Sequence, residues 1–294
     1  MITEATGVPP HPWDAAALGW DRHAGTIRHW LRGATAEMLD AARVSSGQRV
    51  LDIAAGAGDQ TLDIAERIGP AGAVLATDVS TRILALAQER LRAAGVRHAA
   101  IRAADAQALG LAGANFDTAV CRLGLMFCTE PLRALQGAHA ALRPGGRFAM
   151  LVFSAPEANP CLAILVRTAR RHARLGPADP FEPGSLTSLG RADMTASLLR
   201  DAGFVDVEVR RIEAPFELPS ARDYVDFVRS SASPVMQLLA ALPTDAQGAA
   251  WDDMTVQLQA FETPLRWRGP NELLLCAGTA AQHDKPQPRK RTDG

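Results

Sequence analysis

The residues with the clearest chemical potential lie in three short stretches, each of which follows an apolar run. The first is the loop 54–58 (AAGAG), in which no side chain is larger than a methyl group. So bare a backbone lets a ligand approach closely, and the N–H groups that open the following helix favour an anionic group. The other two stretches contain Asp78 and Asp105, carboxylates that can accept hydrogen bonds from hydroxyl or amino groups.

A dinucleotide is one candidate ligand for this loop. The fingerprint G-x-G-x-x-G is incomplete here, because Thr61 occupies the place of its third glycine. Asp59 beside the loop would also repel a pyrophosphate. The sequence therefore disfavours NAD(P), and an NAD(P)-dependent oxidoreductase stays as an alternative.

The elements that must position these residues alternate between strand and helix. Five apolar runs predict strands at 49–55, 73–80, 99–105, 116–124 and 147–155. Helical patterns lie between them at 60–68, 81–95 and 131–146. Such alternation needs crossover connections, and strands that are apolar throughout need helices on both faces of the sheet. We therefore expect an α/β fold with a doubly wound, mostly parallel sheet.

The rest of the chain completes this sheet and adds to it. A helix that ends near Gly203 precedes a sixth strand, and the segment 271–279 predicts a seventh. The regions 156–190 and 213–268 break the alternation. We expect them to form a lid over the carboxyl edge of the sheet, where open α/β folds bind ligands.

Five stretches taken in order resemble the class I S-adenosylmethionine-dependent methyltransferases, in particular the group of ubiquinone/menaquinone C-methyltransferases. They are VLDIAAGAGDQT, ATDVS, ADAQAL, FDTAVCRLGLMF and LRPGGRF. The resemblance covers about residues 45–155. It implies a Rossmann-like methyltransferase fold with seven strands and a helical lid, and S-adenosyl-L-methionine as cofactor.

The resemblance also implies roles for residues of the first stretch. Asp52 would orient the loop, and Ala54, Gly56, Ala57 and Gly58 would pack against the methionine part of the cofactor. The first glycine of the usual loop is Ala54 here, and its usual hydroxyl residue is Ala57. These two departures remove about one hydrogen bond and leave the assignment in place.

The later stretches would bind the remainder of the cofactor. Asp78, followed by Val79, would hold the ribose, and Asp105 with Ala106 would hold the adenine. The backbone of Arg122 would contact the amino-acid end. Its side chain would then face the substrate or an acid.

In the family that the chain resembles, the segment before the first strand closes over the cofactor. Here GWDRHAGTIRHWL (19–31) predicts a helix that carries Trp20, His23 and Trp30. His23 and Arg122 are the candidate catalytic residues, but a lone histidine is also common as a core or surface residue. The two tryptophans could instead attach the helix to the core. No His–Asp or His–Glu constellation is visible, so no general base is assigned.

The expected domains follow from these elements. They are an N-terminal helical cap (1–44), the methyltransferase core (45–212 and 269–280), a helical substrate lid (213–268) and a disordered tail (281–294). The lid is rich in apolar and aromatic side chains, which predict a small apolar or aromatic substrate unless they form the lid's own core. They are Phe216, Tyr224, Phe227, Val235, Met236, Leu238, Leu239, Trp251 and Phe261.

Composition excludes several other classes. The formal net charge is −1, so the chain lacks the basic field that nucleic-acid binding needs. No signal peptide or membrane span is visible, and we expect a cytoplasmic enzyme. The four cysteines show no CxxC spacing, which predicts buried thiols and no metal site. The oligomeric state stays open, with a homodimer as one alternative. A methyltransferase fold that does not transfer methyl groups is the second functional alternative.

Overall fold

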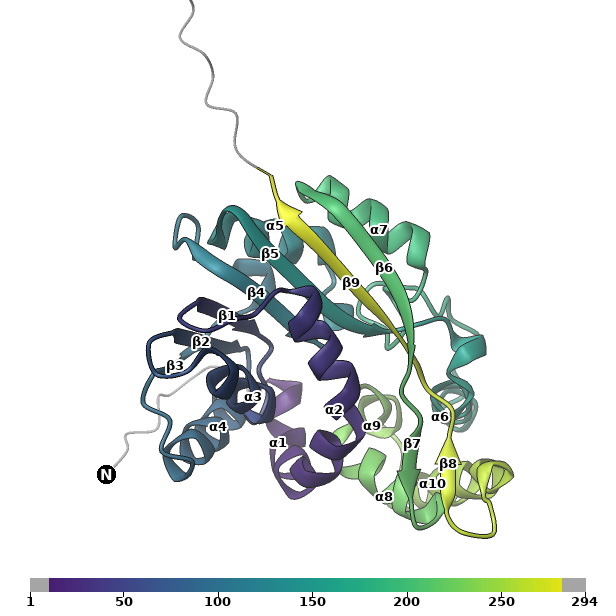
Figure 1. Cartoon of the computed structure of the whole chain (residues 1–294). Coiled ribbons are helices and arrows are strands. Elements are labelled where there is room, and N and C mark those ends of the chain that lie inside the picture. The colour runs from purple at the N-terminus through teal and green to yellow at the C-terminus, as the bar shows by residue number, and fades with distance from the viewer. Residues whose placement is uncertain (1–10, 282–294) are drawn as a thin grey trace, which may run out of the picture.

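A seven-stranded sheet forms the centre of the computed structural model, which describes residues 11–281 (Figure 1). The strand order is β3-β2-β1-β4-β5-β9-β6. The strands are β1 (Arg49–Ile53), β2 (Ala73–Asp78), β3 (Ala99–Ala103), β4 (Phe116–Arg122), β5 (Leu142–Phe153), β6 (Phe204–Glu213) and β9 (Glu272–Ala280). Neighbours among β1 to β5 are parallel, and β9 runs antiparallel to both β5 and β6. The predicted α/β fold with seven strands is confirmed.

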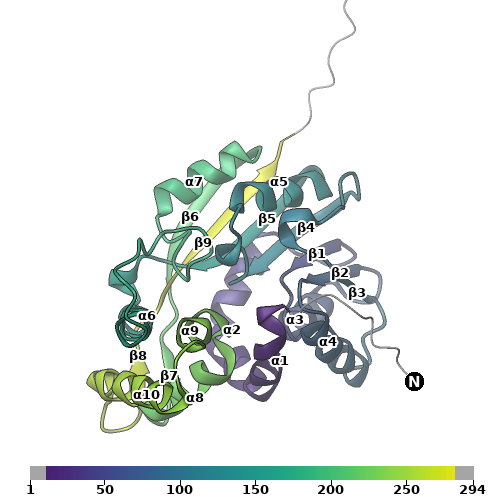
Figure 2. The same ribbon diagram turned by 180° about the vertical axis from the view of Figure 1, so that it is seen from behind.

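Helices cover both faces of this sheet (Figures 1 and 2). One face carries α2 (Ala24–Ala41), α3 (Asp59–Ile68) and α4 (Thr81–Ala93), and the other carries α5 (Pro131–Ala141) and α7 (Ala192–Asp201). The Ser80 hydroxyl accepts a hydrogen bond from the Ile83 N–H and so begins α4. Gly95 follows this helix with a φ of 71°, a conformation that suits glycine at a helix end.

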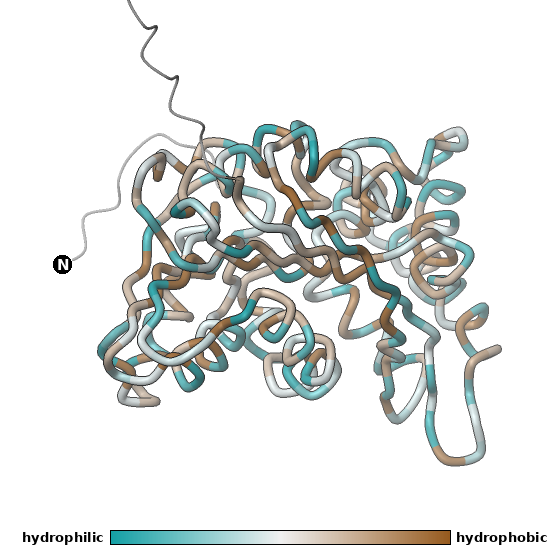
Figure 3. Tube along the Cα trace, turned by 45° about the horizontal axis from the view of Figure 1, so that its top comes forward, coloured by the Kyte–Doolittle hydropathy of each residue, from teal (hydrophilic) through white to brown (hydrophobic). Residues whose placement is uncertain are grey.

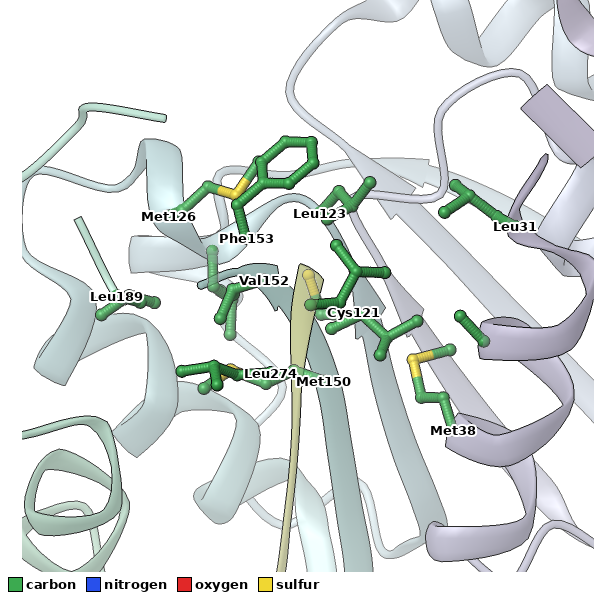
Figure 4. Packing of buried hydrophobic residues seen from close by; sticks show 14 of the residues in the cluster. Leu31, Met38, Cys121, Leu123, Met126, Met150, Val152, Phe153, Leu189 and Leu274 are labelled. Atoms are coloured by element: carbon green, nitrogen blue, oxygen red, sulfur yellow. The ribbon is translucent and has the colours of Figure 1, made fainter. Parts of the chain in front are cut away.

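The core lies between the sheet and these helices. Leu31 and Met38 on α2 face the strands near Cys121 of β4, and Figure 4 shows these side chains grouped with residues of β5 and β9. Burying such a side chain stabilises the fold by about 1.5 to 3 kcal/mol. Figure 3 shows the same pattern along the chain, because apolar segments run through the central strands.

The end of α5 differs from the prediction. The helical pattern predicted 131–146, but α5 ends at Ala141 and β5 begins at Leu142. Pro144 disfavours helical backbone at the residue before it, and Gly145 has a φ of 75°. The register of β4 against β5 shifts between Phe116 and Thr118, so the extra residues form an irregularity at the start of β5.

The predicted helix over 19–31 is in fact two helices. α1 (Pro12–Arg22) ends just before His23, and α2 begins just after it. His23 has φ −100° and ψ 11°, which breaks the helical path. α1 therefore leaves the sheet face and packs against α4 and the lid helices.

The lid contains more than the predicted helices. Its helices are α8 (Ala221–Ser231), α9 (Ser233–Leu239) and α10 (Thr244–Leu258), and β7 (Phe216–Leu218) pairs with β8 (Trp267–Gly269) as a small second sheet. α6 (Pro160–His172), which lies in the region 156–190 that we expected to join the lid, packs against α9 and α10. The domain boundaries stay a prediction, and the tail predicted at 281–294 lies almost wholly outside the described residues.

Candidate active site

The loop 54–58 turns sharply between β1 and α3. Ala54, Gly56 and Gly58 all have positive φ, at 54°, 56° and 85°. Left-handed backbone costs an alanine about 1 to 2 kcal/mol, so the surroundings must hold Ala54 in place. They do so because Gly124 makes room for its methyl group: a Cβ added at Gly124 would lie 2.4 Å from the Ala54 Cβ. The alanine that replaces the usual first glycine is therefore matched by a glycine after β4.

Asp52, at the carboxyl end of β1, is fully buried behind this loop. Its carboxyl group accepts hydrogen bonds from Gln60 Nε2 and from Thr61 Oγ1. Burial raises the pKa of Asp52 to about 7, although both hydrogen bonds act in the opposite direction. Gln60 lines the pocket beside the loop, and its buried Oε1 has no hydrogen-bond partner among the described residues. Asp52 thus fixes the side chain of Gln60 beside the pocket and leaves the Gln60 Oε1 without a partner among the described residues.

Asp78, at the end of β2, joins the loop to the next helix. Its two carboxyl oxygens accept hydrogen bonds from the Gly56 N–H and the Ser80 N–H, both at 3.0 Å. Burial raises the pKa of Asp78 despite these backbone hydrogen bonds. The carboxylate lines the pocket, and each oxygen keeps a lone pair for a ligand hydroxyl.

The third acidic position follows β3. Asp105 accepts a hydrogen bond from the Gln107 N–H at 2.9 Å and begins the short helix η1 (Ala106–Ala108). Asp105, Ala106 and Val79 all line the same pocket as Asp78. The carboxyl ends of β1, β2 and β3 therefore bring the predicted residues together.

Arg122, at the end of β4, pairs with an acid from α3. Its guanidinium donates to Asp59 Oδ2 at 2.5 Å and to Thr35 Oγ1 at 2.9 Å. Both charged side chains are buried and line the pocket. The side chain of Arg122 thus faces an acid, which was one of the two expected arrangements. The pairing also weakens the argument that Asp59 repels a pyrophosphate, because its charge is balanced.

The loop pocket carries an excess of negative charge. Three carboxylates and one guanidinium line it: Asp59, Asp78, Asp105 and Arg122. With all four ionised, two negative charges remain on the wall. Such a wall favours a cationic ligand over an anionic dinucleotide.

A second pocket adjoins the first, and its lining is almost entirely apolar. Trp13, Trp20, Leu123 and Phe127 line both pockets. Most of the remaining wall comes from α6, α8, α9 and β5, and it contains no charged side chain. Members of the predicted lid set that line it are Phe216, Tyr224, Phe227 and Val235. Trp251, Met254 and Leu258 are instead buried within the lid.

The chain is similar to methyltransferases of known family. The sequence model of the ubiE/COQ5 methyltransferase family matches residues 25–165. The ubiquinone/menaquinone biosynthesis C-methyltransferase UbiE of Enterobacter sp. (strain 638) is 30% identical over 185 residues, which cover 60% of this chain and 74% of that relative. The chain belongs to the ubiE/COQ5 methyltransferase family. It is an S-adenosylmethionine-dependent methyltransferase, and S-adenosyl-L-methionine is its cofactor.

Solved structures share the methyltransferase fold with this ubiE/COQ5 member. The YcgJ protein from Bacillus subtilis has a TM-score of 0.58 at 16% identity, over 85% of this chain and 99% of that one. Phosphoethanolamine N-methyltransferase 2 of Haemonchus contortus, in complex with S-adenosyl-L-methionine, has a TM-score of 0.57 at 16% identity, over 94% of this chain and 61% of that one. The family decides against both functional alternatives, the NAD(P)-dependent oxidoreductase and the fold without methyl transfer.

The structure separates the predicted cofactor residues into two groups. Seven line the loop pocket: Ala54, Gly56, Asp78, Val79, Asp105, Ala106 and Arg122. Asp52, Ala57 and Gly58 lie behind it instead. Ala57 packs with Ala17 and Ile83 in a small apolar cluster, which attaches the loop to α1 and α4.

His23 gains no support from the geometry as a general base. It lines neither pocket; its Nε2 lies 3.1 Å from Ser230 Oγ, and its ring contacts Phe227 edge-on. Burial and the neighbouring Arg22 lower its pKa. His23 joins the break between α1 and α2 to the lid, and its catalytic role stays a prediction.

Several lining residues were missed by the sequence analysis. Gln60 and Gln107 lie within the quoted motifs, Gln60 directly after the loop acid Asp59 and Gln107 two residues after Asp105, so their place could have indicated them. Trp13 lies outside the quoted motifs, and Phe127 ends one of them without a neighbouring carboxylate to indicate it. Their rings lie 4.8 Å apart although one comes from α1 and the other follows β4, a contact that only the fold creates.

Three further observations concern the described residues as a whole. No helix within 11–281 is long and apolar enough to cross a membrane. That part of the chain also contains no group of three or more metal-ligating side chains. Cys121, Cys128, Cys161 and Cys276 are buried free thiols, as predicted.

Proposed function

We propose that this methyltransferase acts on a small apolar or aromatic molecule, which lies in the apolar pocket while the cofactor lies in the acidic loop pocket. The observation that carries the proposal is the shared wall of the two pockets, formed by Trp13, Trp20, Leu123 and Phe127. A methyl donor in one pocket and an acceptor in the other would meet at this wall.

The loop pocket fits the amino-acid end of the cofactor. Gln60 Oε1 lacks a partner and would accept a hydrogen bond from the cofactor's α-ammonium group. Ala54 and Gly56 offer close backbone approach to the methionine part. Behind them, the Asp52 carboxyl holds Gln60 and adds negative charge when ionised. These contacts suit a ligand that carries a positive charge.

The nucleoside would follow along the sheet edge. We assign the ribose hydroxyls to Asp78, whose oxygens keep free lone pairs beside their backbone hydrogen bonds. We assign the adenine to Val79, Asp105 and Ala106, which combine apolar surface with one exposed carboxylate. The excess negative charge of the wall supports this placement of a sulfonium compound.

When bound, S-adenosyl-L-methionine supplies an electrophilic methyl group on a sulfonium. The chain's own contribution would be alignment of the acceptor and exclusion of water. Trp13, Trp20 and Phe127 provide the bulk for this at the junction of the pockets. The buried pair of Arg122 and Asp59, which also lines the loop pocket, holds the end of β4 against α3.

Calorimetry and a labelled-methyl assay test the proposal on the full chain. We expect S-adenosyl-L-methionine and S-adenosylhomocysteine to bind, and label to pass to apolar aromatic acceptors from a panel of phenols, quinone precursors and amines. The variant Ala232→Trp would fill the apolar pocket without touching the loop pocket. It should lose transfer while its affinity for S-adenosylhomocysteine stays within about twofold of wild type.

The matched control is Val256→Trp, which places the same side chain at an exposed position of α10. This variant should keep both binding and transfer. Wild-type transfer by Ala232→Trp would show that the acceptor binds elsewhere. Absence of heat with either cofactor form would contradict the assignment of the loop pocket.

A further inference from the structure

Leu123 has a backbone conformation that a leucine rarely adopts. It directly follows Arg122, the last residue of β4, and its φ of 57° lies in the left-handed region. This region is unfavourable for a bulky side chain, so such a residue persists only where its neighbours hold it. The Leu123 N–H donates to the Leu151 carbonyl of β5 at 2.8 Å, which attaches the turn to the sheet. An unfavourable conformation beside a binding site points to a function for the residue.

Leu123 also belongs to the wall that the two pockets share. It is 9% exposed and lines both pockets, and the other three shared residues are aromatic. In Figure 4 its side chain lies between those of Phe153, which lines the apolar pocket, and Leu31, which lines the loop pocket. A glycine would adopt the same backbone without strain, but it would remove this part of the wall. The leucine side chain therefore narrows the passage between the pockets.

The backbone of Leu123 is anchored next to the loop that we assign to the methionine part of the cofactor. The residue after it, Gly124, packs directly on the loop, since a Cβ added there would lie 2.4 Å from the Ala54 Cβ. The residue before it, Arg122, is paired with Asp59 at the start of α3. Leu123 is thus the shared residue that is fixed to both the sheet and the loop.

The three aromatic residues of the shared wall are restrained by contacts of their own. The rings of Trp13 and Phe127 lie 4.8 Å apart, and the Trp20 indole N–H donates to the Ser231 carbonyl at 2.9 Å. These contacts keep the rings from moving aside for a larger group. The bulk of Leu123 therefore decides how large a group fits between the cofactor and the acceptor.

We propose that Leu123 restricts the group carried on the sulfonium to methyl. The transferred group projects from the sulfonium sulfur toward the acceptor, and so toward the wall that the pockets share. A methyl group fits beside the leucine, whereas an ethyl or propyl group on the same sulfur would collide with it. This inference rests on the proposed function, because it assumes that the cofactor lies in the loop pocket and the acceptor lies beyond the shared wall.

Calorimetry with cofactor analogues tests this role without an acceptor. The probes are S-adenosyl-L-methionine and its S-ethyl and S-propyl analogues, and S-adenosylhomocysteine, which lacks the alkyl group, is the reference. Wild type should bind the S-propyl analogue at least about tenfold more weakly than S-adenosyl-L-methionine, because overpacking against a fixed wall is costly. In Leu123→Ala this difference should fall below about threefold, while the affinity for S-adenosylhomocysteine changes by less than about twofold.

Three further variants separate the size of the side chain from effects on folding. Leu123→Gly removes the same side chain and suits the left-handed backbone, so it should accept the S-propyl analogue as Leu123→Ala does. Leu123→Met keeps the bulk and should keep the wild-type preference for methyl. The matched control is Leu189→Ala, which shortens a buried leucine that lines neither of the two pockets and should also keep this preference.

The inference would be wrong if wild type bound the S-propyl analogue as tightly as S-adenosyl-L-methionine, or if Leu123→Ala kept the wild-type preference. It would also be wrong if Phe127→Ala admitted the larger group and Leu123→Ala did not, because the aromatic ring would then limit the size. These results would leave the cofactor site intact as long as S-adenosylhomocysteine binds. Absence of heat with S-adenosylhomocysteine would instead contradict the proposed function, and the inference with it.

Discussion

Asp59 and Arg122 form an ion pair at 2.5 Å in which the two side chains are only 8% and 6% exposed. The pair joins the first turn of α3 to the end of β4. The Arg122 guanidinium also balances the negative charge of Asp59, the carboxylate that was expected to repel a pyrophosphate.

Loss of one partner of this pair should destabilise the protein strongly. Asp59→Asn or Arg122→Met leaves an uncompensated buried charge, for which we expect about 3 to 5 kcal/mol less free energy of unfolding. The double variant should recover part of this loss. Urea unfolding measures all three, with Arg133→Met in the exposed pair with Glu130 as control. A double variant as unstable as the sum of both single variants would contradict the coupling.

Asp78→Ala should weaken cofactor binding. The assignment of the ribose to this carboxylate implies a rise of about tenfold or more in the dissociation constant, since charge-assisted hydrogen bonds contribute about 1.5 to 3 kcal/mol. The loop also loses the acceptor for its Gly56 N–H. Calorimetry with S-adenosylhomocysteine measures the effect, and Asp193→Ala, an exposed acid in the first turn of α7, is the control. Unchanged affinity in Asp78→Ala would remove the ribose assignment.

Cofactor affinity should rise with pH through the titration of Asp52. Its pKa of about 7 means that the carboxyl is mostly protonated at pH 6 and ionised at pH 8. A cationic ligand favours the ionised form, so the dissociation constant should fall by up to about tenfold across this range. Asp52→Asn should remove most of the change. If the variant kept the full pH dependence, another group would be responsible.

The Asp52 carboxyl also predicts how the free energy of unfolding depends on pH. The folded-state pKa of Asp52 lies above the ordinary value of 3.8, so the folded protein binds the proton more tightly than the unfolded chain. Its contribution is fully present below about pH 4 and is lost as the pH rises through about 7. Urea unfolding at a series of pH values should therefore show a decline in stability over this window that is smaller in Asp52→Asn.

Gly124→Ala should destabilise the protein through the loop. The added methyl group would collide with the Ala54 Cβ and approach Cys121 Sγ, and overpacking of this kind costs about 1 to 3 kcal/mol. In an Ala54→Gly background the loss should be smaller, because one of the two contacts is gone. A double-mutant cycle by thermal unfolding measures the coupling. Equal losses in both backgrounds would show that the two residues do not compete for space.

Much of the fold follows from local pattern. The strands β1 to β4 and the starts of α3, α4 and α5 lie within a few residues of their predicted places, since apolar runs and caps act locally. The predictions failed where contacts between segments far apart in the chain determine the local structure. His23 breaks a pattern that reads as one helix, because α1 turns to pack against the lid.

The candidate site divides in the same way. Residues at the carboxyl ends of strands, such as Asp78 and Asp105, could be found because parallel strands bring them to one edge. The apolar pocket could not be located, because Trp13, Phe127 and Asn271 come from segments far apart in the chain. Only the apolar and aromatic composition of the lid indicated that this pocket would be apolar.

The position of β9 has a consequence for synthesis of the chain. This strand lies between β5 and β6 and pairs with both, yet within residues 11–281 it is the last strand to be made. Until residues 272–280 leave the ribosome, the facing edges of β5 and β6 have no partner and can pair with other chains. Nascent chains at this stage should therefore depend on chaperones that shield exposed strands.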